Sequence, residues 1–177
     1  LKYRSLKGDV SDNLSPVFPR IKDKEILNWL IEDVDKLGII DEYIVISNAK
    51  FYSHFETWAK TLPQNITVLN DGTYTNETRL GAVKDVEFAI NKLKLDSDLL
   101  VLAGDNLLDF SLIPFVNYAK SKNATCVLRY FEQDANKLKK SGVLEINDDD
   151  LVVSMEEKPN APKSNWCCPP FYFYTKN

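Results

Sequence analysis

Uninterrupted apolar runs alternate along this chain with segments whose apolar residues recur at helical spacing, and this alternation constrains the fold most strongly. The strand-like runs cover residues 41–47, 65–69 and 99–103. Strands that are buried on both faces have continuous apolar runs of this kind, because helices cover both sides of their sheet. The pattern therefore predicts an α/β fold with a mostly parallel central sheet and helices on both faces.

The remaining elements follow from the same two periodicities. Helices are expected at residues 24–37, 50–62, 78–94 and 112–120, and further strands at 125–130 and 171–174. The apolar runs 142–146 and 151–155 flank a turn-forming Asn-Asp-Asp-Asp sequence, which predicts a late β-hairpin.

The 177 residues contain no repeat or low-complexity linker, so a single domain spanning 1–177 is expected. The chain begins at Leu1 and stops directly after a strand-like run, and we expect it to be incomplete at both ends.

Composition narrows the classes of partner. The net charge of -4 argues against a general nucleic-acid binder or a binder of anionic membranes. No apolar run approaches the roughly 20 residues of a membrane helix. The 3 cysteines include the adjacent pair Cys167 and Cys168, which is a poor disulfide framework and favours a reducing cytoplasm. His54 is the only histidine, so a histidine-based catalytic triad is not expected.

The segment Gly104-Asp105-Asn106 directly follows the most apolar strand-like run. A carboxylate that leaves a buried strand at its carboxyl end is well placed to hold a hard cation such as Mg²⁺ together with substrate phosphates. Gly104 lets the backbone approach a ligand closely. The alternative is an ordinary turn in which Asp105 or Asp109 caps the following helix.

A second polar cluster, Glu156-Glu157-Lys158-Pro159, follows the second run of the expected hairpin. A carboxylate beside an ammonium group suits a ligand with both hydroxyls and a phosphate, since the carboxylate accepts hydrogen bonds and the lysine neutralises charge. The alternative is a solvated charged turn.

Residues 70–82 join an expected strand to an expected helix and are rich in Thr, Asn and Gly. Their hydroxyls, amides and backbone N–H groups could meet a nucleotide or its base. The same segment is equally a capped helix start, with Thr75 or Thr78 as the cap.

Taken in order, these motifs resemble the sugar-1-phosphate nucleotidyltransferases, including the glucose-1-phosphate thymidylyltransferase-like members. The resemblance runs from about residue 15 to the end. It is carried by Pro19-Arg-Ile-Lys-Asp-Lys-Glu-Ile-Leu, Thr78-Arg-Leu-Gly-Ala-Val, Leu99-Leu-Val-Leu-Ala-Gly-Asp-Asn, Gly142-Val-Leu-Glu-Ile and Glu156-Glu-Lys-Pro-Asn-Ala-Pro-Lys-Ser-Asn.

The resemblance implies a Rossmann-like nucleotidyltransferase fold and an enzyme that joins a nucleoside triphosphate to a sugar 1-phosphate with release of pyrophosphate. It implies Mg²⁺ as cofactor and leaves a homo-oligomer open. By this resemblance the metal ligand is Asp105, the sugar-binding residues are Gly142, Glu157 and Lys158, the catalytic cations are Lys158 and Arg4, and the nucleotide-binding residues are Arg4, Thr78, Gly81 and Gly104.

The chain departs from the family pattern near its start, where the family has a glycine-rich phosphate loop followed by a lysine. Arg4 matches the arginine that ends this loop, but the lysine position falls near Ser15 or Pro16. Two alternatives to an active nucleotidyltransferase follow. One is a non-catalytic, regulatory nucleotide-sugar binding module. The other is a metal-dependent glycosyltransferase, although that class usually has an Asp-x-Asp motif after its strand.

Overall fold

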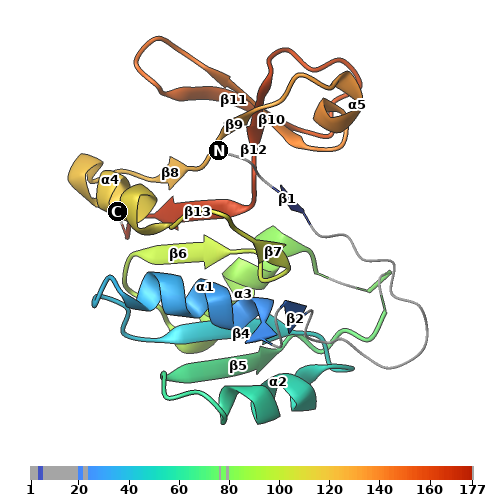
Figure 1. Cartoon of the computed structure of the whole chain (residues 1–177). Coiled ribbons are helices and arrows are strands. Elements are labelled where there is room, and N and C mark those ends of the chain that lie inside the picture. The colour runs from blue at the N-terminus through green and yellow to red at the C-terminus, as the bar shows by residue number, and fades with distance from the viewer. Residues whose placement is uncertain (1–3, 6–19, 22–23, 76, 79, 177) are drawn as a thin grey trace. The chain divides into compact units, whose positions relative to one another are not determined.

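The computed structural model describes residues 4–5, 20–21, 24–75, 77–78 and 80–176. The chain divides into two compact units (Figure 1). The N-terminal unit is Asp9–Ser97, and the C-terminal unit combines Leu1–Gly8 with Asp98–Asn177. The single domain expected from the sequence stays a prediction.

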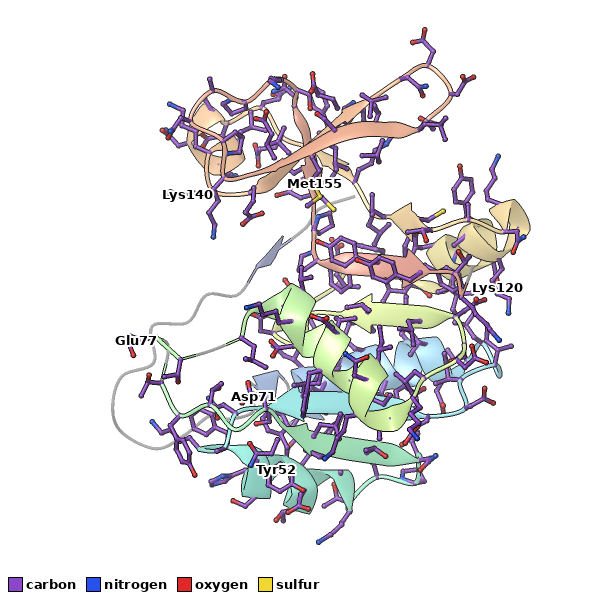
Figure 2. All side chains as sticks on the ribbon, turned by 180° about the vertical axis from the view of Figure 1, so that it is seen from behind. Tyr52, Asp71, Glu77, Lys120, Lys140 and Met155 are labelled. Atoms are coloured by element: carbon purple, nitrogen blue, oxygen red, sulfur yellow. The ribbon has the colours of Figure 1, made fainter. Side chains whose placement is uncertain are left out.

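The N-terminal unit is built around two parallel strands. Its elements are β2 (Arg20–Ile21), β3 (Lys24–Glu25), α1 (Ile26–Asp35), β4 (Tyr43–Ser47), α2 (Tyr52–Ala59), β5 (Ile66–Asn70) and α3 (Ala82–Leu93). Strands β4 and β5 pair in parallel, with Tyr43 opposite Ile66 and Ser47 opposite Asn70. Helices α1 and α3 lie on opposite faces of this pair (Figures 1 and 2). Helix α1 buries Ile26, Leu30, Ile31 and Val34, the stripe that helical spacing predicts.

The described residues of the C-terminal unit form three antiparallel sheets. Its elements are β1 (Arg4–Ser5), β6 (Leu99–Leu102), β7 (Asn106–Leu107), α4 (Ile113–Lys122), β8 (Cys126–Val127), β9 (Tyr130–Phe131), α5 (Ala135–Leu138), β10 (Gly142–Ile146), β11 (Val152–Glu157), β12 (Trp166–Cys168) and β13 (Phe171–Tyr174). One sheet has the order β6-β13-β8, a second has the order β11-β10-β12-β9, and the third is the pair β1-β7. The expected hairpin is confirmed as β10 and β11.

Buried apolar residues occur in both larger sheets of this unit. Phe171 and Phe173 of β13 are buried, as are Leu112, the residue before α4, and Val116 in α4. A cluster of buried residues joins Leu138 of α5 to Val143 and Cys167 of the four-stranded sheet. The ends of β6 and β11 are followed or occupied by residues predicted to be functional.

Three expectations change in detail. The strand expected at 125–130 is two short strands, β8 and β9, which pair with β13 and β12 respectively and so belong to different sheets. The helix expected from residue 78 begins at Ala82. Among the described strands the parallel ladder is β4 with β5, while β13 is antiparallel to both its neighbours. The mostly parallel central sheet stays a prediction.

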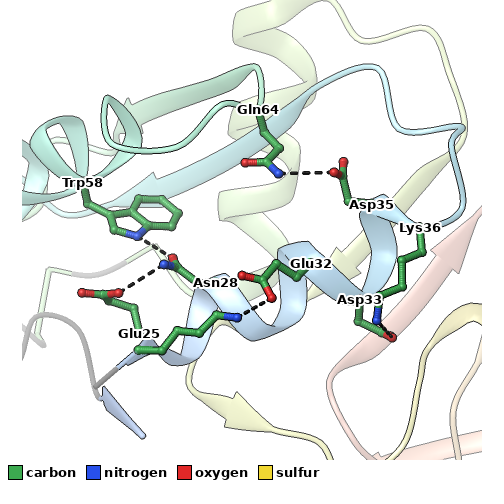
Figure 3. A network of polar contacts seen from close by, with 9 residues as sticks. Glu25, Asn28, Glu32, Asp33, Asp35, Lys36, Trp58 and Gln64 are labelled. Atoms are coloured by element: carbon green, nitrogen blue, oxygen red, sulfur yellow. Dashed lines mark hydrogen bonds and ion pairs between the residues drawn. The ribbon is translucent and has the colours of Figure 1, made fainter. Parts of the chain in front are cut away.

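A polar network ties α1 to α2 in the N-terminal unit (Figure 3). The indole Nε1 of Trp58 donates to Asn28 Oδ1 at 2.8 Å, and Asn28 Nδ2 donates to Glu25 Oε2 at 3.1 Å. Trp58 is only 6% exposed. Its N–H group needs a hydrogen-bond acceptor, because an unsatisfied buried donor is costly. Asn28 therefore links the two helices through a buried aromatic residue.

We expect Asn28→Ala to destabilise the protein by about 1–2 kcal/mol, because it removes the acceptor of the Trp58 hydrogen bond. Chemical denaturation checks this value. The matched comparison is a double-mutant cycle with Trp58→Phe, which removes the donor. If the two effects are simply additive, the hydrogen bond between these side chains does not contribute to stability.

Candidate functional site

The loop after β6 presents an exposed carboxylate on a buried support. Asp105 is exposed, whereas Asn106 is 2% exposed. The Asn106 amide Nδ2 donates to Asp105 Oδ1 at 2.8 Å and to the Ala103 carbonyl at 3.2 Å. Asn106 therefore fixes the Asp105 side chain relative to the end of the strand. Sequence reasoning missed this role, although the buried strand directly before an Asp-Asn pair was a usable signal.

The alternative in which this loop caps the next helix is wrong. The residue at the N-cap of α4 is Leu112, which makes no side-chain capping bond. The Ser111 hydroxyl accepts a hydrogen bond from the Ile113 backbone N–H at 3.1 Å instead. Neither Asp105 nor Asp109 is used to start the helix, and Asp105 is left on the surface at the strand end.

The backbone of Arg4 lies beside the same loop. Strand β1 pairs with β7 so that Arg4 is opposite Leu107 and Ser5 is opposite Asn106. This pairing brings the backbone of Arg4 and Ser5 to the segment that follows Gly104 and Asp105. The role of the Arg4 side chain stays a prediction. Ser15 and Pro16, where the family's loop lysine was sought, lie outside the described residues.

The hairpin β10–β11 brings the predicted sugar-binding residues together. Gly142 is buried and pairs with Glu157 across the hairpin and with Cys168 on the other side. A methyl group placed on Gly142 would lie 3.1 Å from Met155 Cε and 3.3 Å from Glu157 Oε2. A side chain at position 142 would therefore make the ends of these two side chains shift by a few tenths of an ångström. The absence of a side chain on Gly142 leaves this position to Met155 and Glu157.

Lys158 follows β11 in a left-handed backbone conformation, with φ of 50°. Its backbone N–H donates to the Ser141 carbonyl at 3.0 Å, which fixes the end of the hairpin. Its ammonium lies 3.3 Å from Glu157 Oε1, and both side chains are more than 60% exposed. An exposed ion pair of this kind contributes little to stability, so both groups can turn to a ligand at small cost. Strained backbone of this type is often found at functional sites.

Alternation along β11 separates the two neighbouring glutamates. Glu157 shares its face with Gly142 and Met155, while Glu156 projects to the other face and pairs with Lys163 at 2.8 Å. Hydrogen bonding to Glu156 raises the pKa of Lys163. The sequence motif alone does not distinguish the environments of the Glu156 and Glu157 carboxylates. The structure leaves Glu157 beside Gly142 and uses Glu156 in an ion pair.

The predicted nucleotide loop lies in the N-terminal unit. Thr78 closes a turn with Thr75, since its hydroxyl donates to the Thr75 carbonyl at 3.1 Å and accepts from the Thr75 N–H at 3.2 Å. Neither threonine is the N-cap of α3. That position is Gly81, which has φ of 89°, a conformation that favours glycine. The Thr78 hydroxyl therefore joins Thr78 to Thr75, and the nucleotide role of Thr78 and Gly81 stays a prediction.

The described residues contain no group of three or more His, Cys, Asp or Glu side chains arranged to hold a metal ion. Cys167 and Cys168 are buried and unpaired as disulfides. Burial raises the pKa of the Cys168 thiol to about 11, so this thiol is protonated near neutral pH. The role of Asp105 as a metal ligand stays a prediction. Mg²⁺ often uses few protein ligands and several phosphate or water oxygens.

The chain shares its fold with solved nucleotidyltransferases. A Bacillus anthracis protein assigned as a glucose-1-phosphate thymidylyltransferase, in complex with sucrose, superimposes with a TM-score of 0.74 at 15% identity, covering 90% of this chain and 62% of that one. The inositol-1-phosphate CTP transferase from T. maritima superimposes with a TM-score of 0.67 at 14% identity, covering 94% and 64%. These likenesses show an α/β nucleotidyltransferase fold.

Sequence relatives point the same way. The glucose-1-phosphate adenylyltransferase of Clostridium novyi is 25% identical over 173 residues, which are 90% of this chain and 44% of that protein. The enzyme of the same name from Clostridium acetobutylicum is 28% identical over 76 residues, covering 43% of this chain and 20% of that protein. The chain thus spans less than half the length of these curated relatives. Among the described helices, none has the length and hydropathy of a membrane span.

The nucleotidyl transferase family model matches residues 10–177, and the chain therefore belongs to the nucleotidyl transferase family.

Proposed function

We propose that this protein transfers a nucleotidyl group from a nucleoside triphosphate to a sugar 1-phosphate, giving a nucleotide sugar and pyrophosphate. Family membership supports the reaction type. The choice of a sugar 1-phosphate as the acceptor substrate rests on one observation. The neighbouring side chains of Glu157 and Lys158 are exposed together at the end of the hairpin, where Glu157 lies beside buried Gly142. A carboxylate that accepts hydroxyl hydrogen bonds and an ammonium that neutralises phosphate match the two ends of a sugar 1-phosphate.

The proposed chemistry needs alignment and charge neutralisation more than a covalent nucleophile. An oxygen of the sugar phosphate attacks the α-phosphorus, the bond to the bridging oxygen of the β-phosphate breaks, and pyrophosphate leaves with that oxygen. Glu157 holds the sugar hydroxyls, so that the attacking oxygen is oriented. Lys158 and Arg4 neutralise the negative charge that builds up on the phosphates. Gly104 and Gly142 allow the backbone to approach the two substrates closely.

The proposal includes Mg²⁺, held by the exposed Asp105 carboxylate together with phosphate oxygens. The fit rests on the donor set, since a hard oxygen ligand at a strand end suits this ion. The Asn106 amide, 2.8 Å from Asp105 Oδ1, would keep that carboxylate oriented. When bound, Mg²⁺ would supply further neutralisation of the phosphate charge.

The finer features of the family complete the proposal. They are a mostly parallel central sheet covered by helices on both faces, one nucleotidyltransferase domain, and a nucleotide subsite that uses Thr78 and Gly81. We further propose that the protein acts in the cytoplasm on small molecules rather than on nucleic acid or membranes, and that it can form a homo-oligomer. The curated relatives carry names that specify glucose 1-phosphate, which makes a hexose 1-phosphate the first acceptor to test.

Pyrophosphate release measured over a substrate panel tests the proposal. ATP, CTP, GTP, UTP and dTTP are each combined with glucose, galactose, mannose and inositol 1-phosphates in the presence of Mg²⁺. We expect at least one pair to react with a kcat of roughly 1 to 10³ s⁻¹, and EDTA to abolish the reaction. Binding of nucleotide sugar without turnover of any pair would support a non-catalytic binding module instead. Transfer of sugar from a nucleotide sugar, without pyrophosphate release, would identify a glycosyltransferase.

A further inference from the structure

The Met155 side chain lies close to the Glu157 carboxylate, so a ligand bound to Glu157 would also contact Met155. The two residues are two positions apart on β11 and therefore share one face of the strand (Figure 2 labels Met155). Both approach the same point above Gly142, with Met155 Cε at 3.1 Å and Glu157 Oε2 at 3.3 Å from the position of a methyl group on that glycine. A sugar ring that donates hydroxyls to Glu157 can therefore touch the Met155 methyl as well.

Met155 is much more exposed than a core residue. Its side chain is 46% exposed, whereas Leu144, its partner across the hairpin, is 1% exposed. Packing within the sheet therefore accounts for only part of its surface. Cys168 lies on the other side of Gly142, and the raised pKa of its thiol leaves it uncharged. Beside the Lys158 ammonium, the surroundings of the Glu157 carboxylate therefore include the uncharged Met155 side chain.

A flexible thioether beside a hydroxyl-binding carboxylate suits a sugar in a specific way. Sugar rings have patches of C–H bonds that pack against apolar groups, and methionine adapts its shape to such patches. A hydroxyl pointing at the Met155 methyl would lose its hydrogen bonds to water without gaining a partner. An apolar wall of this kind therefore discriminates between sugars by the orientation of their hydroxyls.

We propose that Met155 is a specificity-determining residue of the sugar site. Its methyl group packs against a C–H patch of a hexose 1-phosphate whose hydroxyls donate hydrogen bonds to Glu157. This inference rests on the proposed function. It adds a residue to the site that lies outside the Glu-Glu-Lys-Pro motif and that the sequence motifs did not identify.

Methyl NMR tests the contact directly, because Met155 is the only methionine in the chain. Protein labelled with [methyl-¹³C]methionine is titrated with glucose, galactose and mannose 1-phosphates, while calorimetry on the same samples measures binding. Met155→Leu assigns the signal. We expect the ligand that binds to shift the Met155 methyl resonance and to give NOEs from this methyl to sugar ring protons.

Substitution tests the energetic role with a matched control. Met155→Gln keeps the side-chain length but adds a polar end, and we expect it to raise the Kd of the bound hexose 1-phosphate roughly tenfold. Met155→Leu should stay within about twofold of the unchanged protein. Val153→Gln is the control, since Val153 is an apolar residue of the same strand, two positions before Met155, and is 63% exposed. Its Kd should not change.

The outcomes separate the two claims. A hexose 1-phosphate that binds by calorimetry without shifting the methyl resonance overturns the role of Met155 and leaves the proposed function standing. Equal losses in Met155→Gln and Val153→Gln also overturn it. If none of the three hexose 1-phosphates binds, the proposed function fails, and the role of Met155 fails with it.

Discussion

Replacing Asp105 by Asn is expected to lower Mg²⁺-dependent pyrophosphate release by roughly 10²- to 10³-fold, the usual cost of removing one electrostatic group from a polar transition state. The substitution removes the negative charge but keeps an oxygen at the Oδ1 position. That oxygen can still accept the Asn106 hydrogen bond, which is 2.8 Å long in this structure. Asp105 is also exposed, so its charge contributes little to packing. Activity should therefore fall while the thermal midpoint stays within about 2 °C.

The measurement is kcat with the best substrate pair, as a function of Mg²⁺ concentration, alongside a thermal melt. Asp109→Asn is the matched control, because Asp109 is an exposed carboxylate four residues later in the same loop region. It should retain full turnover. Equal turnover in Asp105→Asn and in the unchanged protein would remove Asp105 from the proposed metal site.

The second large effect is expected at Glu157. Glu157→Gln should raise KM for the sugar 1-phosphate roughly 10- to 100-fold with a much smaller change in kcat, because hydrogen bonds to a charged acceptor contribute about 1.5–3 kcal/mol each. The glutamine keeps the size of the side chain above Gly142, so the hairpin should remain folded. Steady-state kinetics at saturating nucleoside triphosphate gives both constants.

Glu156→Gln is an unusually close control, because the two glutamates are neighbours on one strand with opposite orientations. Glu156 pairs with Lys163 at 2.8 Å. Removing that exposed pair should cost at most about 1 kcal/mol of stability and leave KM unchanged. If Glu156→Gln raises KM as much as Glu157→Gln does, the assignment of the sugar site to the Gly142 face is wrong.

Much of the secondary structure could be predicted because its signals are local. Helical spacing identified α1, and the apolar run before Gly104 identified β6, each within a few residues of its actual ends. The start of α3 was predicted too early, at residue 78 instead of Ala82. There, the Thr78 hydroxyl forms a turn with Thr75 that competes with helix formation. Such local competition is hard to recognise from propensity alone.

The pairing of strands that are distant in the sequence could not be predicted in the same way, unlike the local hairpin β10–β11. The segment 125–130 has the composition of one strand, yet β8 pairs with β13 and β9 pairs with β12. β13 also pairs antiparallel with β6, some 70 residues earlier in the chain. Partners this distant in sequence are selected by burial of the whole sheet, and no local pattern encodes them.

The residue types of the proposed site can be recognised from the sequence: an aspartate after a buried strand, and a carboxylate beside a lysine after a hairpin. The elements that carry them can be recognised too, because periodicity is a property of neighbouring residues. The fold was needed to learn which glutamate stands over Gly142, that Asn106 donates to Asp105, and that Met155 shares the face of Glu157. Such orientations depend on the register between strands, and a shift of one residue would exchange the two faces of β11.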